Sequence, residues 1–238
     1  MTEISSTGDQ MLTVLLTIAR RGPATTTEIA SMLNINRTVA HRLVSTLHQR
    51  AFVRRRPDGY VLGPMVVRLA DAVESDLRRI AMPAMLRLVD ETGETIVLHS
   101  IDGQEAVVID QAVSDRHVLR VQHQAGSRHP LSSGASGRAL LAFQPASAVE
   151  RVVRNHADPA WLRGQIEQIR RSGHAISADE LQRGVHGLAA PILDAHGQAR
   201  ATIAVLVPAE RSRRLAGHAE RVKQSAGGIA ALLSASAK

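Results

Sequence analysis

Hydrophobic residues in the first fifty positions recur every three or four places, which is the spacing of helices that bury one face. The spacing predicts a first helix that ends at the Gly-Pro pair of residues 22–23. Thr25 and Glu28 stand in capping-box register, so a short second helix is expected directly afterwards. After a tight turn, the pattern predicts a third helix over about 37–49.

The third helix separates apolar from polar positions. Its inward row consists of Val39, Leu43 and Leu47, and its other face is polar and basic from the first turn onward. Two short helices joined by a tight turn have helix-turn-helix geometry. The segments 52–56 and 60–62 then flank an Asp-Gly pair, which is a strong hairpin signal. The pattern therefore predicts a winged helix-turn-helix.

An apolar stripe at helical spacing continues over 64–80 and predicts a connecting helix, which Pro83 is expected to break. A new helix is then expected up to Glu91. The stripe consists of Val66, Leu69, Ala70, Val73, Leu77 and Ile80. Such a stripe packs either on its own domain or on a second subunit, and we favour a second subunit because a lone helix-turn-helix contacts few base pairs.

Beyond residue 93 the pattern alternates between short strands and helices. Strands are expected over 95–101, 105–110, 118–122, 174–176, 188–193 and 201–207. Helices are expected over 136–143, over 159–171 and after Glu210. This mixed order predicts an α+β domain with an antiparallel sheet. The expected division of the chain is a winged helix-turn-helix over 1–63, a linker helix over 64–82 and a second domain over 83–238.

Basic charge is concentrated in the helix-turn-helix. The segment 37–56 holds six arginines and no acidic residue, and residues 1–63 hold eight arginines and four acids. Such a surface attracts phosphates, and duplex DNA carries one negative charge per ~1.7 Å of its axis. Double-stranded DNA is therefore the expected partner. A solvated arginine-rich face is the alternative, but three successive arginines on a hairpin repel one another unless an anion lies opposite.

Composition excludes several other classes of protein. The chain has 238 residues and no cysteine, so it has neither a disulfide framework nor a thiolate metal site. It shows no signal-peptide pattern and no run of about 20 apolar residues, so we expect a cytoplasmic protein without membrane contact. Only four aromatic residues are present, which argues against a single-strand platform of stacked rings.

The sequence also lacks the motifs that mark common enzymes. It contains no Gly-x-Ser-x-Gly elbow, Walker loop or dinucleotide fingerprint. His117, His123 and His129 lack the spacing of a zinc-binding helix, so we expect scattered surface histidines, no metal and no cofactor. Asp179 and Glu180 are expected to start a helix rather than to act as an acid and base pair. We therefore predict a protein that is not an enzyme.

A Gly- and Ser-rich segment over 126–140 leads into the helix expected at 136. Free backbone N–H groups at a helix start favour a carboxylate or another anion. An ordinary helix-capping loop is the alternative interpretation.

The third helix carries Thr38, His41, Arg42 and Leu43 at the spacing Thr-x-x-His-Arg-Leu, and Gly59-Tyr60-Val61-Leu62-Gly63 closes the hairpin. These residues resemble the DNA-binding domain of IclR-type bacterial transcription regulators. Asn36 and Ala51 stand where that family usually has proline and glycine. The resemblance implies that the third helix enters the major groove while the wing contacts phosphates or the minor groove. The expected DNA contacts are Thr26, Thr27, Arg37, Thr38, Val39, His41, Arg42, Arg54, Arg55 and Arg56.

The segments 126–142 and 173–197 resemble the same family's effector domain, so the resemblance covers nearly the whole chain. It implies a GAF-like fold with an effector pocket between the sheet and the Gly- and Ser-rich segment. The expected pocket residues are Leu119, Ser132, Ser133, Gly134, Ala135, Gly187, Ala204 and Leu206. The family often has serines at the last two positions and a larger polar group at 187. We therefore expect a roomier, more apolar pocket that favours an aromatic carboxylate over a two- or three-carbon oxo acid.

The sequence thus predicts a DNA-binding transcription regulator whose binding to a palindromic operator is modulated by a small organic-acid or aromatic effector. Repression is the expected mode, with activation as the alternative. The resemblance implies a homodimer, which can pair into a tetramer. The competing hypotheses are an architectural DNA-binding protein without an effector and, less favoured, a small-molecule hydrolase.

Overall fold

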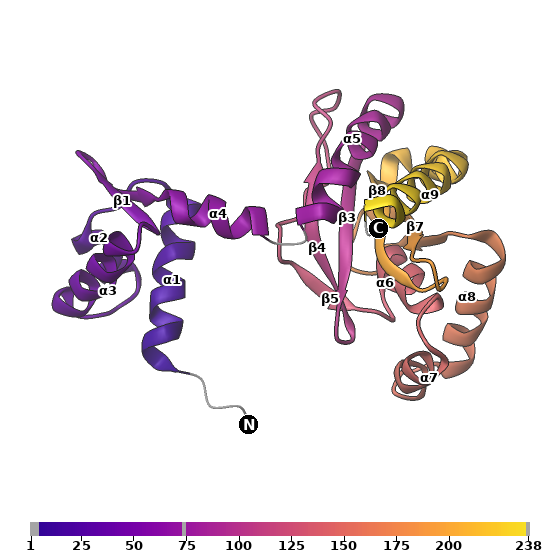
Figure 1. The fold of residues 1–238 in the computed structure, drawn as a ribbon, viewed down its shortest axis with the longest axis horizontal. Helices are drawn as coiled ribbons and strands as arrows, with labels where there is room; N and C mark the ends of the chain where they lie inside the picture. The colour runs from indigo at the N-terminus through magenta and orange to yellow at the C-terminus, as the bar shows by residue number, and fades with distance from the viewer. Residues whose placement is uncertain (1–4, 73–74, 237–238) are drawn as a thin grey trace. The chain divides into compact units, whose positions relative to one another are not determined.

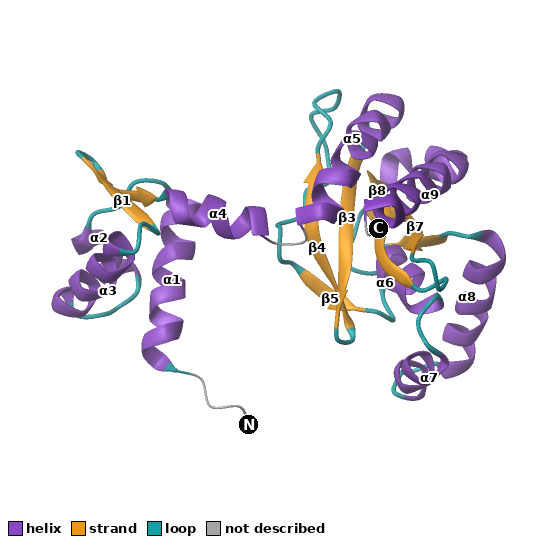
Figure 2. Cartoon of the chain, viewed as in Figure 1, coloured by secondary structure: helices purple, strands orange, loops and turns teal. Residues whose placement is uncertain are grey.

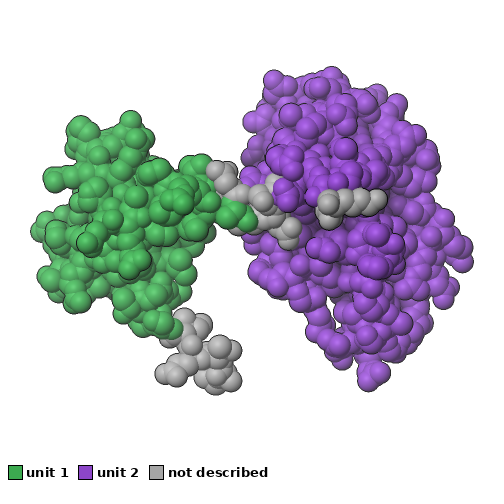
Figure 3. Space-filling view, in the orientation of Figure 1, with its two compact units in different colours: residues 1–73 green, residues 74–238 purple. Residues whose placement is uncertain are grey.

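A computed structural model describes residues 5–72 and 75–236, although the side chains of residues 71 and 75 are not described. The chain forms two compact units, residues 1–73 and 74–238 (Figure 3). Each unit has its own hydrophobic core.

The first unit consists of helices followed by a two-stranded ribbon (Figure 1). Its elements are α1 (Ser6–Arg21), α2 (Thr26–Met32), α3 (Arg37–Gln49), β1 (Val53–Arg56), β2 (Gly59–Leu62) and α4 (Pro64–Ala72). The expected capping box is present, because the Thr25 side chain accepts from the Glu28 N–H and Glu28 reaches back to the Thr25 N–H. The predicted winged helix-turn-helix is confirmed.

The second unit surrounds one sheet with helices (Figure 2). Its elements are α5 (Ser75–Thr92), β3 (Thr95–Asp102), β4 (Glu105–Ala112), β5 (Arg128–Pro130), α6 (Gly134–Ala142), α7 (Ala146–Arg154), α8 (Pro159–Ser172), β6 (Ala175–Ala178), β7 (Val185–Leu193), β8 (Ala199–Pro208), the 3-10 helix η1 (Ala209–His218) and α9 (Ala219–Ser236). The α+β class predicted from the sequence is confirmed.

The sheet has six strands in the order β5-β4-β3-β8-β7-β6, and every neighbouring pair is antiparallel. Side chains of a strand alternate between the two faces. Ile96 and Leu98 of β3 pack with α5 and α9 on one face. Ala189 and Ala204 pack with α6 and α8 on the other face. Because helices cover both faces, the central strands are buried almost throughout.

The segment expected to form one linker helix forms parts of two helices. α4 ends at Ala72, and α5 runs from Ser75 to Thr92 with Pro83 inside it. Val73, one of the stripe positions, lies outside the described residues. The prediction that Pro83 breaks the helix is wrong, because the residues beside it (Ile80, Ala81, Ala84 and Met85) are buried against the sheet while Pro83 itself is exposed. Tertiary packing on one side offsets the backbone hydrogen bond that proline removes.

The strand expected over 118–122 is absent, and this part of the chain is an irregular loop. Side chains rather than a neighbouring strand satisfy two of its backbone carbonyls. The Thr95 hydroxyl donates to the Val121 carbonyl at 2.6 Å, and the Arg211 guanidinium donates to the Leu119 carbonyl at 3.1 Å. The strand that does pair with β4 comes later, at Arg128–Pro130.

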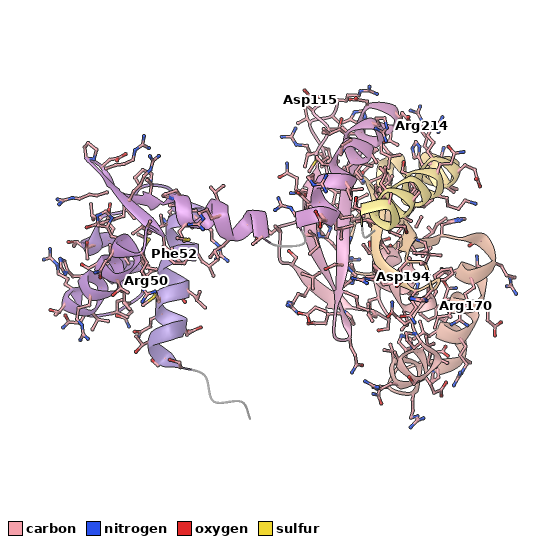
Figure 4. The ribbon with its side chains drawn as sticks, viewed as in Figure 1. Arg50, Phe52, Asp115, Arg170, Asp194 and Arg214 are labelled. Carbon is pink, nitrogen blue, oxygen red and sulfur yellow. The ribbon has the colours of Figure 1, made fainter. Side chains whose placement is uncertain are left out.

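One further helix was not predicted from the sequence, and one predicted turn is present. α7 was not expected, although its buried residues Val149 and Val153 stand at helical spacing. The expected turn at Gly197 is present, and Asp194 stabilises it by accepting the backbone N–H groups of His196 and Gln198 (Figure 4). No helix within the described ranges is long and apolar enough to span a membrane.

Two glycines in helices of the second unit provide a matched test of this packing. A Cβ on Gly137 in α6 would lie 2.7 Å from the Pro130 carbonyl oxygen, whereas a Cβ on Gly164 in α8 would meet nothing within 4 Å. We expect Gly137→Ala to lower the free energy of unfolding by about 1–3 kcal/mol. Gly164→Ala should raise it by up to about 1 kcal/mol, because alanine favours helix. Urea unfolding followed by the fluorescence of Trp161, the only tryptophan, measures both. Equal effects of the two substitutions would contradict the close approach of α6 to the Pro130 backbone.

Candidate functional site

The first turn of α3 is exposed and held in place by two local hydrogen bonds. Asn36 caps the helix, because its side chain accepts the backbone N–H of Thr38 at 2.8 Å. The Arg37 guanidinium donates to the Thr27 hydroxyl of α2 at 2.7 Å, which joins the two helices of the motif at their solvent side. Asn36, which stands where the family usually has proline, thus caps the third helix.

The positive charge on this surface is not neutralised by ion pairs with other described residues. Arg42 in α3 and the three wing arginines Arg54, Arg55 and Arg56 are exposed. None of them forms an ion pair within the described part of the chain. His41 is also exposed and lies one turn from Ser45, with its Nδ1 atom 3.5 Å from the hydroxyl. The surface is therefore free to attract an external anion.

The wing arginines project from both faces of the ribbon. Arg54 and Arg56 share one face and Arg55 lies on the other, since side chains alternate along a strand. The ribbon is tied to the turn before α2 by two hydrogen bonds between the backbones of Ala24 and Tyr60, at 2.8 and 3.1 Å. Gly59 permits this approach, because a Cβ there would lie 2.6 Å from the Ala24 backbone.

The expected DNA-contact residues are brought together, with one qualification. Thr27, Arg37, Thr38, His41 and Arg42 are exposed, and Thr26 is half-buried at the start of α2. Val39 is half-buried and packs against the core of the first unit. Arg50 and Phe52 lie in the short segment that connects α3 to the wing (Figure 4).

A second candidate site is a small cavity of the second unit, with a volume of about 30 Å³. This is room for about one water molecule. Its walls come from four parts of the fold: strand β3, the segment around β5, the start of α6, and β6 to β8. The lining residues are His99, His123, His129, Ala135, Ser136, Ser177, Leu181, Gln182, Val185, Gly187 and Leu206.

Three histidines form one wall of this cavity. The ring of His99 lies 5.5 Å from that of His129 and 6.5 Å from that of His123, measured between centroids and edge to face. His99 is 2% exposed and His129 is 8% exposed. The Nδ1 atom of His99 and the Nε2 atom of His129 are buried and have no hydrogen-bond partner among the described residues.

Burial keeps the histidine cluster neutral. It lowers the pKa of His99 well below its usual value of 6.5, and neighbouring His129 and His123 lower it further. Burial also lowers the pKa of His123, with a contribution from His129. For His129, burial lowers the pKa although the Pro130 carbonyl and Glu105 favour the charged form. Neutral rings are the state in which imidazole both donates and accepts hydrogen bonds.

The start of α6 already has an anion bound to it. The Gly134 N–H donates to the Glu180 carboxylate at 2.8 Å. Glu180 also forms a two-pronged ion pair with Arg138, whose side chain is 1% exposed and donates in addition to the Ile176 carbonyl. The prediction that Asp179 and Glu180 start a helix is wrong, since they lie in a bend after β6. The protein's own carboxylate occupies the helix start that the sequence suggested for a ligand.

The expected pocket residues separate into two groups. Ala135, Gly187 and Leu206 line the cavity. Gly134 lies beside it, where its positive φ of 71° and the nearby Leu181 side chain favour glycine. The others lie elsewhere: Ser132 and Ser133 are half-buried before α6, Ala204 is fully buried in the core, and Leu119 is exposed in the loop after β4.

The expectation of a roomier pocket has no support in the contacts around position 187. A Cβ on Gly187 would lie 3.1 Å from the Leu206 side chain and 3.2 Å from the Ser177 hydroxyl. Leucine at 206 therefore fills the space that glycine at 187 leaves. The small cavity no longer supports a preference for a bulky effector.

The histidines are the residues that sequence reasoning missed, and the expectation of scattered surface histidines is wrong for this group. His99 lies in the strand Thr95–Asp102, whose first six residues are all buried, and a histidine in such a run was the available signal. His123 and His129 come from segments whose positions only the folded sheet determines. In the ranges that the structure describes, no group of three or more ligating side chains has the arrangement of a metal site.

Comparison with known proteins gives matches over both units. The family model described as "Bacterial transcriptional regulator IclR C-terminal" matches residues 70–231. A model of the MarR family matches residues 9–60, which cover the helix-turn-helix.

Full-length relatives agree with these matches. The HTH-type transcriptional regulator BhcR of Paracoccus denitrificans is 31% identical over 85% of this chain and 77% of its own length. The transcriptional repressor IclR of Escherichia coli is 27% identical over 80% of this chain and 75% of its own. An IclR homologue of Microbacterium hydrocarbonoxydans, solved in complex with 4-hydroxybenzoate, has the same fold, with a TM-score of 0.78 at 23% identity, covering 97% and 100% of the two chains.

The buried histidines predict a dependence of stability on pH. Their pKa values are lowered in the folded state, so below pH 6.5 the unfolded chain takes up protons that the native protein does not. Stability should be fully present above that pH and should fall as the pH decreases from 6.5 toward 5.5. The slope is up to about 1.4 kcal/mol per pH unit for each histidine that stays neutral.

Urea unfolding at pH 7.5 and 5.5 measures this effect. His99→Gln should reduce the loss of stability at low pH, whereas His196→Gln, at an exposed turn, should leave the loss as in the unaltered protein. Equal stability of the unaltered protein at both pH values would show that the cluster is protonated in the folded state.

Proposed function

The chain belongs to the IclR family of DNA-binding transcription regulators, and we propose that it represses transcription from a palindromic operator and responds to a small organic acid bound in its second unit. The observation that carries the proposal is the exposed start of α3 beside an arginine-rich wing, where no carboxylate of the described residues pairs with Arg42 or with the wing arginines. The relatives are transcription regulators, in agreement with the prediction that the chain is not an enzyme.

The two parts of the basic surface have different tasks. α3 enters the major groove, where Thr38, His41 and Arg42 read base edges and an arginine selects guanine by two parallel hydrogen bonds. Thr26, Thr27 and Arg37, at the junction of α2 and α3, hold the adjacent phosphates. Val39 supports this surface from the core side, where it packs in the first unit. The wing arginines Arg54, Arg55 and Arg56 bind phosphates or a narrow minor groove and supply most of the affinity that depends on salt.

We infer that the mode of regulation is repression, because the E. coli relative is named a transcriptional repressor. A regulator bound across a promoter excludes other proteins from that DNA. Because its target is chromosomal DNA in a bacterium, the protein acts in the cytoplasm.

The effector binds in the histidine-lined cavity. Support comes from the two unpaired buried nitrogen atoms and from the convergence of four parts of the fold on one space. The family relative in complex with 4-hydroxybenzoate indicates that a carboxylate is a suitable ligand class for this fold. In functional terms the chain divides into a DNA-binding part (1–63), a connecting part (64–82) and an effector-binding part (83–238). A coupling free energy of about 1–3 kcal/mol between effector and DNA would change operator occupancy by a factor of about 5–150.

The protein binds its operator as a homodimer, which pairs into a tetramer. Four large aliphatic side chains of the first unit are exposed: Leu12 and Leu16 on α1, and Val67 and Leu69 on α4. Large exposed apolar groups gathered on two helices of one small unit indicate a protein interface. Two DNA-binding units related by a two-fold axis match a palindromic site.

The assignment of base and phosphate contacts is tested by two variants. Arg42→Ala should cost about 1–3 kcal/mol on the preferred DNA sequence and should relax sequence preference at one position. Arg55→Ala should weaken binding to all sequences alike and reduce the slope of log K against log salt by about one unit. The measurement is fluorescence anisotropy of labelled duplexes selected by genomic footprinting, over a series of salt concentrations.

Arg163→Ala is the matched control, because Arg163 lies on α8 of the second unit and pairs with Glu150. It should leave DNA affinity unchanged. Identical behaviour of the α3 and wing variants across the salt series would refute the division of tasks. If the unaltered protein bound no DNA duplex at low salt, DNA binding by this surface would be refuted.

The dimer is tested by adding charge to its proposed surface. Leu16→Glu and Leu69→Glu should shift the protein from dimer toward monomer in sedimentation velocity, because a buried unpaired carboxylate opposes association. Leu86→Glu alters an equally exposed leucine on α5 and should leave the dimer intact. A dimer that survives both changes in the first unit must use another surface.

A further inference from the structure

Two of the histidines that line the cavity of the second unit each have a buried nitrogen atom with no hydrogen-bond partner among the described residues. His129 places its Nδ1 atom 3.3 Å from its neighbouring Pro130 carbonyl oxygen, so this nitrogen carries the proton of the neutral ring. The Nε2 atom is then a bare acceptor, and it is buried without a partner. The Nδ1 atom of His99, whose ring centroid lies 5.5 Å from that of His129, is also buried without a partner among the described residues. Buried polar atoms are almost always paired, so these two nitrogen atoms are candidates for hydrogen bonds to a ligand.

The charged groups around the cluster are already engaged. Glu105 of β4 and Glu180 of the bend after β6 favour a charged His129. Glu105, however, is paired with Arg128 at 3.1 Å, and Glu180 is paired with Arg138 and the Gly134 N–H.

The other groups that face the cluster add no charge of their own. They are the third histidine, His123, and three neutral residues: Val108 opposite His99 on β4, Thr202 opposite it on β8, and Ser136 of α6. A proton on the cluster therefore has no counter-ion of its own among the described residues.

We propose that this histidine cluster recognises the carboxylate of the effector and takes up one proton from solvent when the carboxylate binds, so that effector affinity rises as the pH falls. The inference rests on the proposed function only in taking this cavity as the effector site. It adds the ligand's required charge and the dependence of binding on pH.

The proton balance of the step is simple. A proton from water or buffer forms the Nε2–H bond of His129, and the resulting imidazolium donates to a carboxylate oxygen. No bond of the ligand breaks or forms. The ligand's negative charge supplies the counter-ion that the empty cavity lacks, which offsets the burial that otherwise keeps the ring neutral. Hydrogen bonds between two charged groups are shorter and stronger than neutral ones.

The size of the cavity suits the head of such a ligand rather than the whole of it. About 30 Å³ leaves room for little more than a carboxylate group. Leu181 and Gln182, which form part of the lining, are exposed and belong to the bend at 179–184. A larger ligand would displace this bend, whose Glu180 is bound to Arg138.

Displacement of the bend should change the surroundings of Trp161, the only tryptophan in the sequence. The guanidinium carbon of Arg138 lies 5.3 Å from the Trp161 ring centroid. Any shift of the ion pair between Glu180 and Arg138 changes the charge next to this ring. Trp161 fluorescence is therefore an independent reading of ligand binding.

Isothermal titration calorimetry of the full chain tests the proposal with two probes, pyruvate and 4-hydroxybenzoate. Titrations at pH 7 in the presence of a chelator are repeated in buffers with different ionisation enthalpies, and the slope of the observed enthalpy gives the number of protons taken up. We expect uptake between about 0.5 and 1 proton per site for at least one probe. Affinity should rise by up to about tenfold per unit decrease in pH, and the rise should stop once the histidine is also protonated in the unliganded protein.

Matched controls separate the effect of the ligand's charge from the effect of the histidine rings. 4-Hydroxybenzamide, the uncharged counterpart, should bind more weakly and take up no proton. His129→Gln should abolish uptake, and His99→Gln is the second variant if the first does not fold. His196→Gln, in the exposed turn before β8, should behave as the unaltered protein does.

Each outcome decides a separate point. If a carboxylate bound with no change in the number of bound protons in any buffer, the proposed coupling between ligand binding and proton uptake would be overturned. Failure of both carboxylates to bind, by calorimetry and by Trp161 fluorescence, would overturn recognition of the anion by the cluster. Proton-linked binding that leaves DNA affinity unchanged would support the inference while refuting effector control of the operator, which the anisotropy measurement reads separately.

Discussion

Helices cover both faces of the six-stranded sheet, and this constraint decides where polar side chains of the second unit have partners. α5 and α9 close one face, and α6 with α8 closes the other. Any polar group on an inner strand position is removed from water and has to find its partner within the protein or from a ligand. Arg138 pairs two of its nitrogen atoms with Glu180 and Ile176. His99 and His129 each have one nitrogen without a partner among the described residues, so the candidate effector site is one of the places where buried polar groups of this unit remain incomplete.

The first unit differs from the second because its charged groups are exposed and not buried. Its core is made of apolar residues of α1 to α3 and the wing, and its charged residues lie outside that core. The arginines of α3 and the wing are not paired with protein carboxylates in the described chain, so their attraction for an external polyanion is not reduced by internal ion pairs. One unit leaves charge available to solvent, and the other buries neutral rings that a charged ligand can ionise. Both proposed binding sites thus lie where charged or polar groups have no partner among the described residues.

The errors of the sequence analysis arise from contacts between segments that are distant along the chain. Pro83 has the local properties of a helix breaker, but its neighbours bury against strands that follow it, and the helix continues. Val118 and Leu119 have the composition of a strand, yet their segment forms hydrogen bonds with the side chains of Thr95 and Arg211. Leu206 is an expected pocket residue that fills the pocket, because Gly187 lies opposite it on the next strand.

Local physics was sufficient for the helix-turn-helix, the hairpin at Asp58-Gly59 and the concentration of arginine, because capping, turn formation and charge depend on residues close together in sequence. The sequence by itself therefore determined the fold class and the attraction for DNA. Only the tertiary structure decided that Glu180 occupies the start of α6 and that three histidines from β3, β5 and a loop meet in one cavity. The reason is that burial and pairing are properties of the folded sheet, which brings together residues that no local pattern connects.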